Sequence, residues 1–319
     1  MAGSSRVAGN ACSAFLFSIL STLHATVLAQ VDDTYVGGFG KSFSARTYGG
    51  YSFTSLTHRF ESSPEETYVP NVPPYFGLGA HWNGIGGSFS YGLGFANPHK
   101  KEERSKYLDL QLHYYGDRIV FDFFGQRYKG FSIRKDDVSH FYSDVGVMKW
   151  GGFLQYNINY KRFSYPAAFS QSKRQLQSAG TLLVSLAFYY ARVYADSTFA
   201  EGRVGDRIRF VFGPSAGYAY SFVFGKHTYA TGSLSFGVHA CVDAVTGKGE
   251  ACPTMFPRMS WVYMADTWAL AVSAQYNLVY VSFTDDDKLA LGTLDGQIAF
   301  TKRFDLAPTA PGKTAREHL

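Results

Sequence analysis

Bulky apolar residues alternate with small or polar ones along most of the chain. In residues 267–284 the even positions carry mostly Trp, Leu, Val and Tyr, whereas the odd positions carry Ala, Ser, Gln and Asn. A period of two residues is that of a β-strand, whose side chains point to opposite faces of the sheet in turn. The same split recurs and predicts twelve strands, over residues 43–56, 74–82, 85–96, 106–115, 118–130, 146–160, 177–193, 207–224, 228–241, 256–264, 267–282 and 289–304.

The connections between these strands alternate in length. Short ones, such as Asn83-Gly84 and Gly116-Asp117, come between longer polar segments. Short turns at one end of a sheet and long loops at the other are typical of antiparallel barrels of the outer membrane. The long loops are predicted over residues 57–73, 97–105, 131–145, 194–206, 242–255 and 283–288.

Residues 161–176 do not fit this alternation of short and long connections, because a short turn is expected at this place and the segment is long. The stretch Tyr165-Pro166-Ala167-Ala168-Phe169 is compatible with a helix or with a segment tucked under the mouth of the barrel. An extra strand is a third alternative. It would make the strand count odd and would invert every later loop.

The two shortest turns also predict strand register. The Asn83-Gly84 turn puts Leu78 opposite Phe89. A two-residue turn between the fourth and fifth strands puts Leu112 opposite Phe121. In both hairpins bulky residues then meet bulky residues on one face.

The two faces of the strands differ too much for a soluble sheet. One face is bulky and rich in aromatics, while the other mixes Gly, Ser and Ala with charged and amide residues and would make a poor hydrophobic core. We therefore predict an all-β fold, an antiparallel transmembrane β-barrel of about twelve strands whose apolar side faces lipid. A secreted β-sandwich is the alternative.

The composition agrees with this assignment. Aromatic residues make up 17% of the 319 residues and charged residues another 17%, and the mean hydropathy is −0.12. A polytopic helical membrane protein would score well above zero, and a disordered chain would lack aromatics. The net charge of +5 is too small and too dispersed to indicate nucleic-acid binding.

The N-terminus is typical of an export signal. Arg6 precedes an apolar run over residues 14–20, and Val27 and Ala29 fit a signal-peptidase site. A membrane anchor is the alternative. The predicted organisation is a signal peptide over 1–29, a periplasmic N-terminal segment over 30–42, an outer-membrane barrel over 43–304 and a polar C-terminal tail over 305–319.

Three stretches resemble a known family. They are residues 106–111 running to 122–130, residues 161–165 running to 178–180, and Gly213-Pro214-Ser215-Ala216-Gly217-Tyr218-Ala219-Tyr220. They are similar to an uncharacterised family of exported Gram-negative proteins, classed as a domain of unknown function and expected to be outer-membrane barrels. The resemblance covers nearly all of the mature chain. It implies the fold and the compartment, and it brings no activity, ligand or catalytic residue.

Polar residues on the inward face form the candidate site. A charged constriction that selects solutes is one interpretation of Lys149, Arg207, Arg209, Asp295 and Arg303. The other, which we favour, is that they form salt bridges that fill a closed barrel, because twelve strands enclose only a small lumen. The candidate lumen network is Asp109, Gln111, His113, Asp122, Gln126, Lys149, Arg207, Arg209, Asp295 and Arg303.

Catalytic and metal sites are less well supported. Ser88 and Ser90 face inward near His113 and Asp122, so a lipid-acting hydrolase is conceivable, although such an enzyme would present its triad on the outer wall. Ser215 lies in a G-x-S-x-G match that falls within a strand, and the motif requires a strand-to-helix turn. The histidines show no metal-ligand spacing, and we expect no cofactor.

Cys241 and Cys252 flank the end of one predicted strand and the start of the next. In an oxidising compartment this spacing predicts a disulfide across the mouth of a hairpin.

The sequence therefore predicts an outer-membrane barrel, either structural or a small solute channel. An outer-membrane lipid-acting hydrolase and a binding module that acts through surface loops are the alternatives. The expected partners are outer-membrane lipid and the outer-membrane assembly machinery, which would recognise the aromatic-ended last strand at Phe304. The oligomeric state stays open.

Overall fold

The computed structural model describes residues 31–39, 42–61, 63–82, 85–97, 103–135, 138–195 and 205–305. The predicted signal peptide, the Asn83-Gly84 turn and residues 306–319 of the predicted tail lie outside the described residues.

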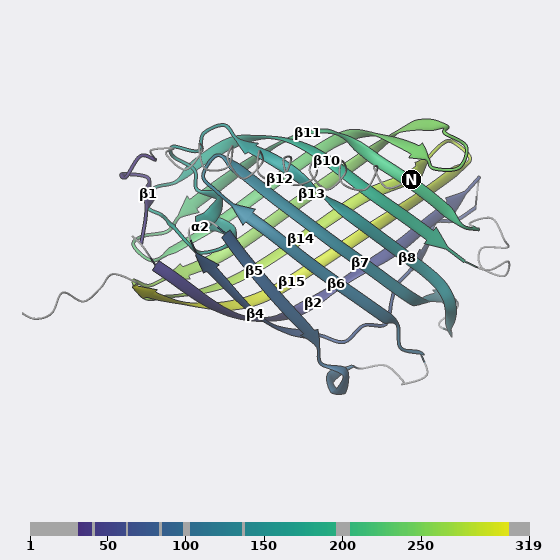
Figure 1. The fold of residues 1–319 in the computed structure, drawn as a ribbon, viewed down its shortest axis with the longest axis horizontal. Helices are drawn as coiled ribbons and strands as arrows, with labels where there is room; N and C mark the ends of the chain where they lie inside the picture. The colour runs from purple at the N-terminus through teal and green to yellow at the C-terminus, as the bar shows by residue number, and fades with distance from the viewer. Residues whose placement is uncertain are drawn as a thin grey trace, which may run out of the picture.

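Twelve long strands form a closed antiparallel ring in the described part of the chain (Figure 1). Each strand pairs with its neighbours in chain order, and the last strand pairs with the first from Asp287↔Phe60 to Asp305↔Ser42. This confirms the predicted barrel. The strands are β2 (Ser42–Phe60), β4 (Tyr75–Trp82), β5 (Ile85–Gly92), β6 (Lys106–Tyr115), β7 (Ile119–Lys135), β8 (Val138–Asn157), β10 (Ala179–Tyr194), β11 (Arg207–Val223), β12 (Thr228–Asp243), β13 (Gly249–Met264), β14 (Trp268–Phe283) and β15 (Asp287–Asp305).

Smaller elements lie at the two ends of the ring. At the end that carries the short connections, called here the turn end, β1 (Val36–Gly37) pairs with β9 (Arg174–Gln175) beside the helix α2 (Tyr165–Phe169). The opposite end, called the loop end, carries β3 (Glu66–Tyr68) and the 3-10 turn η1 (Gly94–Ala96). No helix among the described residues is long and apolar enough to cross a membrane.

The strands β4, β5 and β6 are the shortest of the ring, and β3 compensates for this at the loop end. Tyr68 of β3 pairs with Leu56 of β2, and the adjacent Val69 forms a bridge with Ser132 of β7. The segment around β3 thus links β2 to β7 beyond the ends of the three short strands.

The outer face of the ring is apolar. Along β10 the inward residues are buried in regular alternation, whereas Leu182, Leu186 and Phe188 on the outer face are 52–64% exposed. Similar large side chains surround the ring on β4, β5, β6, β11, β12 and β15. Such a continuous apolar surface far exceeds what a soluble monomer exposes, and it fits the hydrocarbon core of a membrane.

Two predicted loops are wrong. The segment 131–145 is not a loop, because β7 and β8 continue to Lys135 and Val138 and stay paired. Likewise, only residues 244–248 separate β12 from β13 within the predicted loop 242–255. Polar residues near these strand ends suggested loops, yet strands that extend beyond the apolar belt can carry polar side chains without leaving the ladder.

One predicted register is confirmed and the other is wrong. Leu78 pairs with Phe89 as expected. Leu112 pairs with Phe123 instead of Phe121, because Tyr115 pairs with Val120 and the intervening turn is longer than two residues. A shift by two leaves each side chain on its predicted face.

The loop end of the interior is filled by an apolar core, which corrects the expectation of a polar interior throughout. Inward side chains from around the ring meet there, and each is at most 5% exposed. This apolar layer consists of Leu56, Tyr68, Val72, Tyr128, Phe131, Ile133, Val145, Val147, Ala191, Val193, Val281, Leu289 and Leu291.

The turn end of the interior is filled by residues 161–176, called here the plug. Ser164 caps α2 by accepting a hydrogen bond from the Ala167 backbone amide at 3.1 Å. The helix enters the ring, where Ala167 is fully buried and its carbonyl accepts a hydrogen bond from the Tyr229 hydroxyl at 2.8 Å. The plug is thus the tucked segment that the sequence allowed, and its β9 joins no barrel strand.

Replacing Leu186 by Arg tests the outer face, because it puts a charge in the middle of β10. We expect the free energy of unfolding in lipid vesicles to fall by about 2–4 kcal/mol, the cost of a basic residue near the bilayer midplane. Urea unfolding followed by tryptophan fluorescence measures it. Leu186→Phe is the control and should stay close to the parent; equal stability of both variants would contradict a lipid-facing position.

Candidate functional site

A chamber of about 800 Å³ lies inside the ring. Its walls come mainly from β2, β4, β5, β6 and β7, with contributions from β8, β13, β14 and β15. The apolar layer begins two residues further along several of the same strands, as at Tyr128 beyond Gln126 and Leu291 beyond Thr293. Phe169 and Ser170 of the plug line the chamber from the other end.

A hydrogen-bonded chain crosses the middle of the chamber. Lys149 is 1% exposed, and its ammonium donates to the Thr293 hydroxyl at 2.6 Å. Thr293 lies 2.9 Å from the Thr54 hydroxyl. The Thr54 hydroxyl donates to the Gln126 side-chain oxygen at 3.4 Å, and the Gln126 side-chain nitrogen donates to Asp109 at 3.1 Å. These contacts join four strands of the ring, β2, β7, β8 and β15, to β6.

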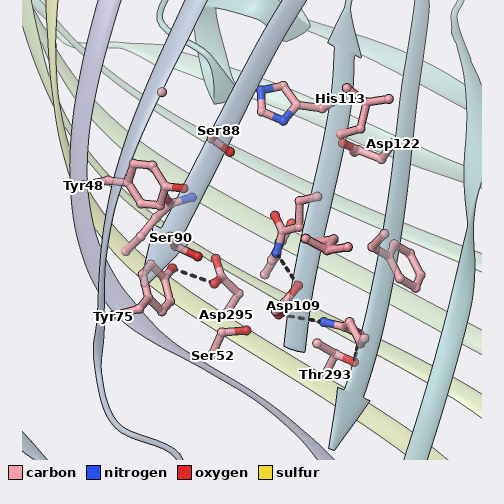
Figure 2. Close-up of a pocket in the computed structure, with 18 of the residues that line it drawn as sticks. Tyr48, Ser52, Tyr75, Ser88, Ser90, Asp109, His113, Asp122, Thr293 and Asp295 are labelled. Carbon is pink, nitrogen blue, oxygen red and sulfur yellow. Dashed lines mark hydrogen bonds between the residues drawn. The ribbon is translucent and has the colours of Figure 1, made fainter. Parts of the chain in front are cut away.

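A second group lines the wall beside β4. Tyr75 donates to the Asp295 carboxylate at 2.7 Å, and both residues face the chamber in Figure 2. Arg46 lies over the ring of Tyr48 at 5.5 Å, with its Nε buried and unpartnered. Gly77 makes this arrangement fit, because a side chain there would collide with the ring of Tyr48.

A buried ion pair of the chamber wall is also hydrogen-bonded to the plug. The Arg258 guanidinium donates to Asp122 at 3.2 Å and to Gln275 at 2.8 Å, and it also donates to the Tyr165 hydroxyl of the plug. Both ions are largely buried, with 7% and 13% of their side chains exposed. Arg258 was not predicted from the sequence. The alternation along β13 could have identified it, because Arg258 and Ser260 share the face opposite the apolar Met259 and Trp261.

The predicted network divides into separate levels. Asp109, Gln126, Lys149 and Asp295 lie at the middle of the chamber. His113 and Asp122 lie nearer the plug, and Gln111 lies beside Asp109 and donates to it at 3.4 Å.

The basic residues of the candidate network lie at different heights in the barrel and do not meet in one constriction. Near the loop end, Arg207 pairs with Asp287, and Arg209 lies 3.7 Å from Asp243. At the turn end, Arg303 donates to backbone carbonyls, including that of Trp268 at 2.9 Å. These arginines hold connections at the barrel ends and do not converge with Lys149 or Asp295.

The barrel wall has an opening between β5 and β6. These two strands form only three residue pairs in the described part of the chain, from Ile85↔Tyr114 to Gly87↔Leu112. Their outer neighbours are fully paired, since β5 pairs with β4 and β6 with β7 over their whole lengths. The facing edges of residues 88–91 and 108–111 therefore have no ladder partner among the described residues. This stretch is called here the wall opening.

The wall opening leads into the chamber. Ser88 and Ser90 point inward and Phe89 points outward, yet all three line the same cavity. The same holds for Asp109 and Leu110 across the opening, and Figure 2 shows Ser88, Ser90 and Asp109 on its two flanks. Because inward and outward side chains of both β5 and β6 line this cavity, it passes through the barrel wall. At the loop end Gly92 leaves room for the Tyr107 hydroxyl, which narrows the opening there.

The chamber does not assemble a hydrolase triad. His113 pairs across the strands with Asp122, but no hydrogen bond joins their side chains or links His113 to Ser90 in the described residues. Elsewhere Ser215 lies 3.0 Å from His239 Nε2, a pair that sequence reasoning missed. The His239 Nδ1 is buried without a partner, so no carboxylate orients this pair.

Cys241 and Cys252 are joined by a disulfide between β12 and β13. The disulfide lies on the inner face among buried apolar residues and away from the wall opening. No group of three or more potential metal ligands occurs among the described residues.

The chain belongs to the family described as a domain of unknown function (DUF4421), whose model matches residues 30–300. This confirms the resemblance to an uncharacterised family. No curated protein matches the chain.

Several solved barrels are similar to the chain at low identity. The translocator domain of the autotransporter NalP from Neisseria meningitidis is 12% identical, with a TM-score of 0.42 and coverage of 93% of this chain and 98% of that one. The outer membrane protease OmpT from Escherichia coli is 7% identical, with a TM-score of 0.38 and coverage of 82% and 97%. The toluene transporter TodX from P. putida is 9% identical, with a TM-score of 0.29 and coverage of 83% and 90%.

Replacing Arg258 by Met tests the ion pair beneath the chamber. The change leaves the Asp122 carboxylate buried without its cation, so we expect the free energy of unfolding to fall by about 3–5 kcal/mol. Urea unfolding in vesicles measures it.

Arg192→Met is the matched control. It removes an exposed pair with Asp206, a carboxyl whose pKa lies below its usual range because Arg192 donates a hydrogen bond to it. The control should change stability far less, because exposed pairs are screened by solvent. Equal losses in the two variants would contradict the role given to the buried pair.

Proposed function

We propose that this member of the DUF4421 family is an outer-membrane barrel that binds small apolar or amphipathic molecules in its chamber. It exchanges them with the surrounding lipid through the wall opening. The turn end, which carries the chain termini of the barrel and the short connections, faces the periplasm, and the loop end faces outward. The export signal predicted over residues 1–29 supports this placement.

The filled ends of the barrel argue against an open solute channel. Conduction requires a continuous hydrated path, yet the apolar layer crosses the interior at the loop end with side chains no more than 5% exposed. At the turn end the plug is buried in the ring, with Tyr165 only 1% exposed. Movement along the axis is therefore blocked at both ends of the chamber.

The wall opening is the single observation that carries the proposal. A closed structural barrel in lipid pairs every strand edge, because an unsatisfied backbone group in hydrocarbon costs several kcal/mol. Unpaired edges are tolerated only where they line a hydrated cavity or contact a polar ligand. The edges at residues 88–91 and 108–111 meet this condition only because the chamber lies behind them.

The size and lining of the chamber fit a small molecule. Its volume of about 800 Å³ falls within the range of ligand pockets. Apolar side chains surround the outer mouth, where Phe89 and Tyr91 are 69% and 71% exposed and Leu110 is 44% exposed. The interior combines charged side chains, such as Lys149 and Asp295, with aromatic rings, such as Phe124 and Phe153. A molecule that enters from the bilayer thus passes from an apolar rim to a mixed interior that holds charged groups.

Planar bilayers test the axial closure. We expect the purified protein to show no steady ohmic conductance, because the apolar layer and the plug interrupt the water path. An open-pore barrel reconstituted in the same lipid gives the positive control. A stable conductance from the native protein would contradict the proposal and would restore the solute channel.

Replacing Ser90 by Trp tests access through the wall. The indole would occupy the mouth of the chamber, so saturable binding of the apolar fluorophore N-phenyl-1-naphthylamine should weaken by about tenfold or more, which corresponds to about 1.4 kcal/mol. Fluorescence titration of the protein in amphipol measures it.

Val184→Trp is the control, because Val184 lies on the outer face of β10 and is 49% exposed. It should bind the fluorophore as the parent does. Unchanged binding by the Ser90 variant would show that molecules do not enter between β5 and β6.

A further inference from the structure

We infer that the chamber selects amphiphiles with an anionic head, a phosphate or carboxylate that binds Arg46 while the apolar tail leaves through the wall opening. This inference rests on the proposed function and adds the chemical class of the ligand. Four observations carry it: an unpaired guanidinium, engaged neighbouring carboxylates, a path of small residues, and an apolar rim.

Arg46 is a cation without a counter-ion. It comes from the inner face of β2 and lines the chamber. In the described part of the chain it forms no ion pair, its Nε is buried without a hydrogen-bond partner, and its guanidinium lies over the Tyr48 ring. Asp295 attracts it from beyond ion-pair distance. An arginine held in this way matches the two oxygens of a phosphate or carboxylate.

The carboxylates of the chamber are already engaged by other groups. Asp295 accepts from Tyr75, Asp109 accepts from Gln126, and Asp122 accepts from Arg258. The lining includes the basic residues Arg46, Arg104, Lys149 and Arg258, and the acidic residues Asp109, Asp122 and Asp295. Arg104 is exposed outside the strands, and Arg258 is paired with Asp122. Arg46 and Lys149 are therefore the inward-facing cations of the chamber that hold no carboxylate among the described residues. Lys149 donates to Thr293, which leaves Arg46 as the cation open to an anionic ligand.

Small residues connect Arg46 to the wall opening. Arg46 pairs with Gly79 of β4, and Gly79 pairs with Ser88 of β5, whose far edge is the open one. A side chain at Gly79 would lie between the two, with its Cβ 3.7 Å from that of Arg46 and 3.3 Å from that of Ser88. Two strand spacings, about 10 Å, thus separate the Arg46 backbone from the open edge, with nothing larger than serine on this row.

The rim of the wall opening fits the other end of the same ligand. Phe89 and Tyr91 on β5 and Leu108 and Leu110 on β6 are exposed on the outer face. A head at Arg46 and a tail between these residues would occupy the chamber and the opening together. An inserted polypeptide strand would also pair the open edges, but it would make no use of the buried cation.

The test measures the affinity of the purified protein in amphipol for three single-chain amphiphiles, each below its critical micelle concentration. They are dodecyl phosphate, neutral dodecyl maltoside and cationic dodecyltrimethylammonium. We expect dodecyl phosphate to bind at least tenfold more tightly than the cation. Inorganic phosphate alone should bind far more weakly than dodecyl phosphate, because it lacks the tail.

Two variants test head-group binding and access to Arg46 separately. Arg46→Gln should lose about tenfold in affinity for dodecyl phosphate and retain its affinity for dodecyl maltoside. Gly79→Leu keeps Arg46 and blocks the row of small residues, so it should weaken binding of the phosphate head. Arg192→Gln, on the exposed outer face, is the control for charge and should change neither affinity.

The outcomes distinguish this inference from the proposed function. Binding of dodecyl maltoside with no preference for an anionic head, or an Arg46→Gln variant with unchanged phosphate affinity, would overturn the inference and leave the proposed function standing. Tight binding of inorganic phosphate alone would also overturn it. Failure of all three amphiphiles to bind would overturn the proposed function itself.

Discussion

The need to pair backbone hydrogen bonds in hydrocarbon governs this molecule. A membrane strand has no water to satisfy a free amide or carbonyl, so the sheet must close on itself. The chain achieves this by pairing all of β15 with β2. It departs from the rule beside the chamber, between β5 and β6, where two strand edges face each other without a ladder in the described ring. A departure at this cost is best explained by the chamber behind it.

The filling of the interior follows from the same closure. A ring of twelve strands leaves a space that side chains and one inserted segment can fill. This barrel fills its interior in two ways. The apolar layer packs at the loop end, and the plug enters at the turn end. The chamber lies between them, where buried Lys149 and Asp295 are held by hydroxyl donors and acceptors and not by each other.

The sequence predicted the strands and their faces because alternation is a local property. A two-residue period needs only the identity of nearby side chains, and it identified Asp109, Gln126 and Lys149 as inward. Register and height depend on turn lengths, which is why Leu112 was paired two residues away from its true partner. The positions of Arg207 and Arg303 along the barrel axis could not be predicted. They depend on the register of every preceding strand pair, and each turn length contributes to that register.

The wall opening could not be predicted from the sequence either, although the sequence shows one of its causes. Loss of pairing between two strands leaves each strand with its normal alternation, so β5 and β6 look like any others. The inner face of β5, however, carries little more than glycine and serine, with Ser88 and Ser90 as its largest described side chains. Such a face cannot fill the space in front of it, and this absence of bulk creates the chamber. The residues that fail to pack are therefore the residues that make room for a ligand, with Arg46 on the adjoining row as the group that would bind it.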